Sequence, residues 1–283
     1  MKFADIGAST LAFRDEGRGE ALLLIHGLAG DHTAWDPQVA AWKSRFRVIA
    51  PDTRGAGRST QCDEPVTIEE LADDFLRLLD LAGVERVHVV GRSMGGCIGQ
   101  WMALKQPARV ASLALLASCG KFDPFALRAL ESMREVLEWT GSWEAHARHS
   151  IRNFVSPAFF NDQQERVHDI ERLIGSSTRL KACYVQQNRA VSRHDLLARL
   201  HEIKCPVLVM SGEVDPLGGP LLTRWMLERL PDVRHVEFPG CSHFFLMEDP
   251  GRFMREMDNW FDHVAPGNRG LAARTRAATS TSA

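Results

Sequence analysis

The sequence predicts an α/β fold with a mostly parallel, doubly wound sheet that has helices on both faces. Three observations predict it: short apolar runs recur, helical patterns lie between most of them, and one long helical stretch interrupts the alternation. Continuous apolar runs are typical of strands buried on both faces. The runs are ALLLIH (21–26), RVIAP (47–51), RVHVV (86–90), ASLALLAS (111–118), PVLVMSG (206–212) and VEFPG (236–240).

The helices between these strands have recognisable starts and stops. Thr67 and Glu70 have the spacing of a capping box, and apolar residues then follow at helical spacing. Further helices are expected over 94–106, which ends before a proline, over 220–230, and after Asp249, which is followed by a proline at the first helical position. Strands that alternate with helices favour a doubly wound sheet.

The alternation stops between residues 119 and 204, a stretch that looks wholly helical. A crossover between parallel strands needs only about a dozen residues, so we expect a helical cap inserted into a core made of 1–118 and 205–263. The tail 264–283 is small, polar and basic, which predicts disorder. The cap is rich in aromatic residues: Phe122, Phe125, Trp139, Trp143, Phe154, Phe159 and Phe160.

Composition excludes several functional classes. The 283 residues carry 34 Lys and Arg against 36 Asp and Glu, a net charge of −2, so no global field would recruit nucleic acid or an anionic membrane. No apolar run approaches the roughly 18–20 residues of a membrane span, and the first residues lack the apolar block of a secretory signal. Six scattered cysteines form neither a CxxC nor a zinc spacing. We expect a reduced, cytoplasmic monomer or homodimer with no metal or cofactor.

The sharpest motif is G-x-S-x-G, in which Ser93 lies between Gly91 and Gly95. It follows a predicted strand directly and precedes a predicted helix. A serine on such a tight turn has strained backbone geometry, and flanking glycines let strand and helix approach closely. We therefore predict Ser93 as a nucleophile at the carboxyl end of the sheet.

A serine hydroxyl needs a base, and position selects His243 among eleven histidines. His243 follows the last strand, so its loop lies at the same edge as Ser93, whereas His26 is expected to shape a loop. The base needs a carboxylate to fix its tautomer, and Asp215 follows the penultimate strand. Glu213 and Asp123 remain as alternatives for this acid.

The chain resembles the α/β-hydrolase fold family, in particular its serine esterases and enol-lactone hydrolases. The matching segments occur in the family's order, and the resemblance covers roughly 8–263. It implies that the backbone N–H groups of Leu28 and Met94 form the oxyanion hole, where fixed donors stabilise charge on the carbonyl oxygen. The segments are LLLIHGLAG (22–30), APDTRGAGRS (50–59), GRSMGG (91–96), SGEVDP (211–216) and CSHFFLMEDP (241–250).

Other conspicuous residues are expected to be structural. Asp52 would cap a turn, and Cys97 would be a small buried thiol on the inner face of its helix. Arg92 departs from the family pattern; pairing with a nearby acid is favoured over contact with an anionic substrate.

The cap aromatics are expected to be mostly cap core. Phe122 and Trp139 are the candidates that face the substrate, together with Phe244 beside the base.

These features predict hydrolysis of a small-molecule carboxylic ester or lactone. Serine at position 93, rather than aspartate, speaks against haloalkane dehalogenase and epoxide hydrolase chemistry. Three alternatives stay open: a C–C bond hydrolase of ring-cleavage products, a cofactor-free perhydrolase, and a ligand receptor on the same fold.

Overall fold

The computed structural model describes residues 1–268 except Ala8 and Cys62. Its centre is an eight-stranded sheet in the order β1-β2-β4-β3-β5-β6-β7-β8, in which β1 and β2 are antiparallel to their neighbours and the other pairs are parallel. The predicted α/β fold with a mostly parallel sheet is confirmed. The strands are β1 (Lys2–Asp5), β2 (Thr10–Glu16), β3 (Ala21–Ile25), β4 (Arg47–Pro51), β5 (Val87–Arg92), β6 (Val110–Leu116), β7 (Val207–Gly212) and β8 (Val233–Phe238).

The central strands form because their apolar runs are covered on both faces. Every residue of β3, β5 and β7 is buried. The apolar runs did not predict β1 and β2. Edge strand β1 has no buried residue, and only three of the seven residues of β2 are buried, so both strands lack the long continuous apolar signal.

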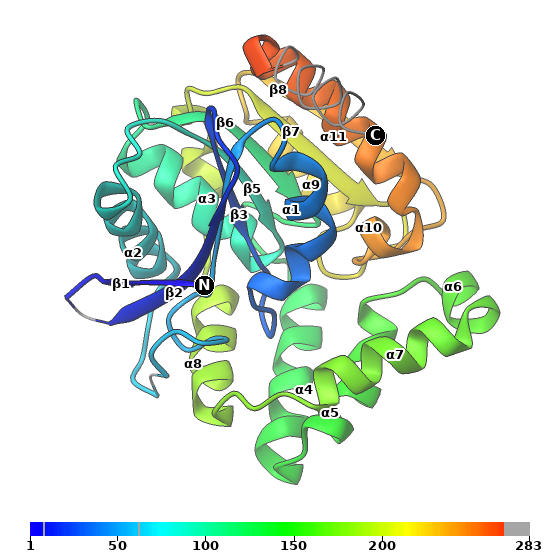
Figure 1. Cartoon of the computed structure of the whole chain (residues 1–283). Coiled ribbons are helices and arrows are strands. Elements are labelled where there is room, and N and C mark those ends of the chain that lie inside the picture. The colour runs from blue at the N-terminus through cyan, green and yellow to red at the C-terminus, as the bar shows by residue number, and fades with distance from the viewer. Residues whose placement is uncertain (8, 62, 269–283) are drawn as a thin grey trace, which may run out of the picture.

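Helices cover both faces of the sheet (Figure 1). One apolar cluster joins the sheet to α2 (Ile68–Leu81), α3 (Met94–Lys105) and α9 (Pro220–Leu227). A second cluster joins the opposite face to α1 (Asp36–Trp42) and α11 (Pro250–Val264). The predicted capping box of α2 is present, and Asp249 caps α11 as expected.

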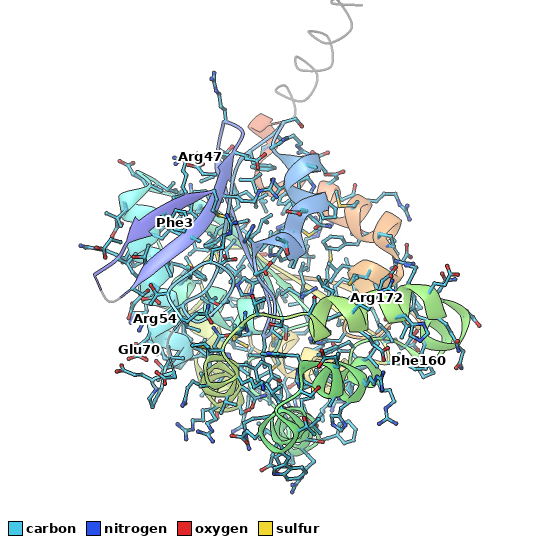
Figure 2. All side chains as sticks on the ribbon, turned by 60° about the horizontal axis from the view of Figure 1, so that its bottom comes forward. Phe3, Arg47, Arg54, Glu70, Phe160 and Arg172 are labelled. Atoms are coloured by element: carbon cyan, nitrogen blue, oxygen red, sulfur yellow. The ribbon has the colours of Figure 1, made fainter. Side chains whose placement is uncertain are left out.

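Between β6 and β7 the chain forms a layer of helices below the sheet in Figure 1. Figure 2 brings this layer forward, with Phe160 and Arg172 labelled toward one end of it. The predicted limits of the cap, 119 and 204, fall in the loops that join this layer to the core. Its elements are α4 (Pro124–Thr140), α5 (Trp143–Ser150), η2 (Ile151–Asn153), α6 (Pro157–Asp162), α7 (Gln164–Gly175), α8 (Lys181–Ser192) and η3 (Leu197–Glu202).

The end of the described chain differs from the predicted tail. Helix α11 continues to Val264, and a short 3-10 turn, η4 (Pro266–Asn268), follows it. The rest of that prediction, 269–283, lies outside the described residues. Among the described helices, none combines the length and apolar character that a membrane crossing needs.

Candidate active site

Ser93 lies on a strained turn between β5 and α3, with φ 52° and ψ −118°. Glycines on both sides make this turn possible. A Cβ on Gly91 would lie 2.3 Å from the carbonyl oxygen of Gly95, and a Cβ on Gly95 would lie 2.3 Å from that of Ile25. Side chains at these positions would clash with backbone, so the motif needs glycine on both sides of Ser93.

His243 and Asp215 form a buried pair at the carboxyl end of the sheet. His243 Nδ1 lies 2.9 Å from Asp215 Oδ2 and 3.1 Å from Oδ1. Asp215 Oδ1 also accepts the N–H of Leu217 at 2.7 Å, which fixes the carboxylate. A proton on Nδ1 that points at Asp215 leaves Nε2 as the nitrogen able to accept a proton.

The two alternative acids are engaged elsewhere. Glu213 accepts the N–H of Gly240 at 2.7 Å. Asp123 caps α4 by accepting the N–H of Ala126 at 2.9 Å. Of the three candidate carboxylates, Asp215 is therefore the one that the structure pairs with His243.

A cavity of about 560 Å³ lies between the sheet edge and the cap, and Ser93, His243 and Leu28 all line it. The Leu28 loop lies beside Ser93, since a Cβ on Gly27 would be 3.3 Å from Ser93 Cβ. The predicted nucleophile, the predicted base and the loop of one predicted oxyanion donor thus meet at one cavity.

The predicted oxyanion donors have no acceptor within the described part of the chain. Neither the N–H of Leu28 nor that of Met94 forms a hydrogen bond there. Met94 is the first residue of α3, where helix N–H groups lack intrahelical partners and the helix dipole favours negative charge. Both N–H groups are available to a ligand, as the resemblance implies.

Of the three predicted substrate contacts, the structure places Phe244 at the cavity and the other two residues away from its described lining. Phe244 lines the cavity, whereas neither Phe122 nor Trp139 is among its described lining residues. Trp139 is 76% exposed, because it lies on the outer face of α4. The opposite face carries Leu137 and the other buried residues of this helix, which recur about one turn apart. Phe122 is buried in the core cluster beside α3 instead.

Cap residue Phe154 lines the cavity and was not singled out from the sequence. Its ring stacks on Phe244 with centroids 4.7 Å apart and on His243 at 6.0 Å. Its carbonyl oxygen accepts the N–H of Phe244 at 2.7 Å. Its aromatic character is visible in the sequence, but only the folded cap brings it to His243.

Hydrogen bonds of His26 stabilise the loops behind the site, which is the loop-shaping role that the sequence predicts for this residue. Buried His26 contacts the carbonyl oxygen of Gly27 through Nδ1 at 2.8 Å and accepts the N–H of Thr53 at Nε2. Burial lowers the pKa of His26 to about 4, so the neutral ring makes these contacts at neutral pH. Cys97 is a buried thiol, as expected.

One group in the described chain, Asp31, His32 and Asp52, has the donor types of a metal site. Both oxygens of Asp52 and one oxygen of Asp31 already accept hydrogen bonds. Asp52 accepts the N–H groups of His32 and Arg58 and faces His32 Nδ1 at 2.8 Å, and Asp31 accepts the N–H of Thr33. These hydrogen bonds stabilise two loops, which is the turn-capping role expected of Asp52.

Arg92 does not show the favoured pairing with an acid. No ion pair in the described part of the chain includes it, and its guanidinium carbon lies 4.8 Å above the Phe244 ring. It lines the cavity with Ser93. The arginine thus belongs to the cavity rather than to the packing behind the elbow.

Comparisons with known proteins agree with this architecture. The alpha/beta hydrolase fold family profile matches residues 20–250. A protein of Azorhizobium caulinodans that carries the provisional name carbamate hydrolase RutD is 31% identical over 89% of this chain and 95% of its own. The 3-oxoadipate enol-lactonase 1 of Acinetobacter baylyi is 29% identical over 83% and 86%. A thermophilic esterase structure from Thermogutta terrifontis superposes with a TM-score of 0.80 at 29% identity, covering 90% and 94%.

Proposed function

Because the chain belongs to the alpha/beta hydrolase fold family, we propose that it is a serine hydrolase that cleaves a carboxylic ester or lactone. The observation that supports this most strongly is the combination of a strained Ser93 and a buried His243–Asp215 pair at one cavity. This arrangement supplies a nucleophile, a base and an orienting carboxylate.

In the proposed mechanism, His243 Nε2 takes the proton of Ser93 while Oγ attacks the substrate carbonyl. Asp215 holds the imidazole tautomer and stabilises the imidazolium. The N–H groups of Leu28 and Met94 stabilise the oxyanion of the tetrahedral intermediate. His243 then protonates the leaving alcohol and activates a water that hydrolyses the acyl-enzyme.

The substrate class rests on the relatives as well as on the cavity. An enol-lactonase and an esterase are among them, and both names describe acyl transfer to water. The relative named carbamate hydrolase favours a second candidate, cleavage of a carbamate by the same nucleophile. The scattered cysteines favour a reducing compartment, so we place this enzyme in the cytoplasm. We further propose that it acts on a small molecule as a monomer or homodimer.

Ser93→Ala tests the proposal. We expect kcat for a short-chain 4-nitrophenyl ester and a simple lactone to fall by about 10³-fold or more, while the circular dichroism spectrum is unchanged. The exposed Ser44→Ala is the matched control and should keep full activity. Activity retained in Ser93→Ala would contradict the proposal. A folded wild type that turns over no ester, lactone or carbamate would favour the C–C hydrolase or receptor alternatives.

A further inference from the structure

Arg92 is a buried cation without an anionic partner. Its side chain and backbone together are 8% exposed, and it lines the cavity beside Ser93. Across the described residues, no side chain or carbonyl accepts a hydrogen bond from its guanidinium. Burial lowers the pKa of Arg92 to about 10, so the group still carries its charge at neutral pH.

The position of Arg92 is defined from two sides. Its guanidinium carbon lies 4.8 Å above the ring of Phe244, the residue after the base. Its Nε would be 3.6 Å from a Cβ on Gly27, which precedes the predicted oxyanion donor Leu28. The cation therefore lies between the loop that bears the base and the loop that bears the oxyanion donor.

The other arginines that line the cavity already have acceptors. Arg179 donates to the carbonyl oxygen of Gly30 at 2.6 Å and to Gln187 Oε1 at 3.3 Å. The negative charges of Asp31 and Asp52 act on Arg179 as well, whereas burial alone shifts the pKa of Arg92.

Arg166 also has an acceptor and a packing partner. It donates to the carbonyl oxygen of Met247 and stacks on Phe159. Within the described cavity wall, Arg92 is thus the arginine whose N–H groups have no acceptor from the protein.

A buried charge without a partner is unfavourable, and an anionic ligand would relieve that cost. We propose that Arg92 binds a carboxylate of the substrate, so that the enzyme prefers esters or lactones that carry a second, free carboxylate. A guanidinium offers a planar fork of N–H donors that matches a carboxylate. This proposal rests on the proposed hydrolase function.

Two pairs of esters that differ in charge test it. Monomethyl adipate and dimethyl adipate place the charge on the acyl part, and 4-acetoxybenzoate and its methyl ester place it on the leaving group. Wild type should have the higher kcat/KM for the charged member of at least one pair. Arg92→Met should lower that value by about 10- to 100-fold, mainly through KM, and the neutral partner's by less than about threefold.

The controls separate charge recognition from a general loss. Arg92→Lys keeps the charge and should recover part of the preference. Arg128→Met removes an exposed arginine of α4 and should leave the ratio of the two esters unchanged. Thermal unfolding of each variant shows whether the fold survives.

Equal losses of kcat/KM for the charged and the neutral esters would assign Arg92 to the reacting oxygen and overturn the proposal. Unchanged kcat/KM for both kinds of ester would overturn it as well. Calorimetric titration with adipate and 4-hydroxybenzoate tests binding without turnover. At least one should bind wild type about 10-fold or more tighter than Arg92→Met. If wild type hydrolyses no ester, lactone or carbamate but binds one anion through Arg92, the hydrolase proposal fails and the anion site stands.

Discussion

At the scale of single residues, backbone strain marks the candidate site. The non-glycine residues with positive φ among those described are Ala29, Ser93 and Ala117. They follow β3, β5 and β6, at the edge of the sheet where the cavity lies. Each such residue costs on the order of 1–3 kcal/mol and persists only when its surroundings fix it. Close backbone packing around Gly91 and Gly95 supplies that constraint at Ser93.

Asp215→Asn tests the acid at this scale. Asparagine has only one acceptor oxygen, and its NH2 group donates where the carboxylate accepts. It therefore cannot hold His243 in the required tautomer as Asp215 does, so kcat should fall by about 10³- to 10⁴-fold with little change in stability. Glu213→Gln and Asp123→Asn are the matched controls, because these carboxylates bind backbone N–H groups elsewhere. Ester hydrolysis at pH 7.5 measures all three. If Asp215→Asn kept near-normal activity while one of the two control variants was inactive, the acid changed in that control would be the carboxylate that orients His243.

At the scale of elements, the cap is attached to a loop behind the site and to the loop that carries His243. Gln187 of α8 donates to Thr53 Oγ1 at 3.1 Å and to the carbonyl oxygen of Arg54 at 2.6 Å. On the other side, Glu248 Oε1 accepts the N–H groups of Ser156 in the cap and Ser242 beside the base. The cap therefore positions these loops as well as closing the cavity.

Gln187→Leu should show this attachment. The change keeps the size of a buried side chain but leaves the two core acceptors unpaired, so the free energy of unfolding should fall by about 1–3 kcal/mol. Urea denaturation at pH 7.5 measures the loss. Gln164→Leu, at an exposed position of α7, should change stability by less than about 0.5 kcal/mol. Equal stability of the two variants would show that the Gln187 hydrogen bonds contribute nothing.

The contact between β3 and α3 gives a second test at this scale. Gly95→Ala would place a Cβ 2.3 Å from the carbonyl oxygen of Ile25, so strand and helix must separate. We expect a loss of about 2 kcal/mol or more in the free energy of unfolding. Gly251→Ala, within α11 and free of such contacts, should be neutral or slightly stabilising. A stable Gly95→Ala enzyme would contradict the close packing described.

The same elements show what could be predicted from sequence. The buried strands from β3 to β7 can be recognised in the sequence as continuous apolar runs. Ser93 and His243 each follow a strand, and the carboxyl ends of these strands lie at one edge of the sheet. Edge strand β1 and short helix α1 have no such signal. The exposed position of Trp139 could not be predicted, because aromatic content does not reveal which face of α4 packs inward. The environment of Arg92 depends on loops distant in sequence, so only the fold shows that it lacks an acid.

At the scale of the whole molecule, the sheet separates two apolar cores, and the cap adds buried polar groups of its own. His146 of α5 is one of them. It contacts the carbonyl oxygen of Met133 at 2.9 Å and packs against Trp143 and Tyr184. Burial lowers the pKa of His146 to about 4. The folded protein therefore keeps this histidine neutral where an unfolded chain would protonate it.

This makes stability depend on pH in a definite direction. Because the folded pKa of His146 lies below the ordinary value near 6.5, its contribution is complete above pH 6.5 and is lost as pH falls toward 4. In His146→Phe that dependence is absent. Between pH 7.5 and pH 5, wild type should lose about 2 kcal/mol more unfolding free energy than the variant. Urea titrations at both pH values measure the difference, and parallel losses would contradict the buried neutral histidine.

The central claim is that Ser93 forms the acyl-enzyme, and covalent labelling tests it most directly. A fluorophosphonate reacts with an activated serine, and mass spectrometry of the digested protein then locates the modified residue. We predict one label per chain, on the peptide that contains Ser93, with ester hydrolysis lost in proportion and no labelling of Ser93→Ala. A protein that hydrolyses esters but remains unlabelled at Ser93, or is labelled at another residue, would contradict the account.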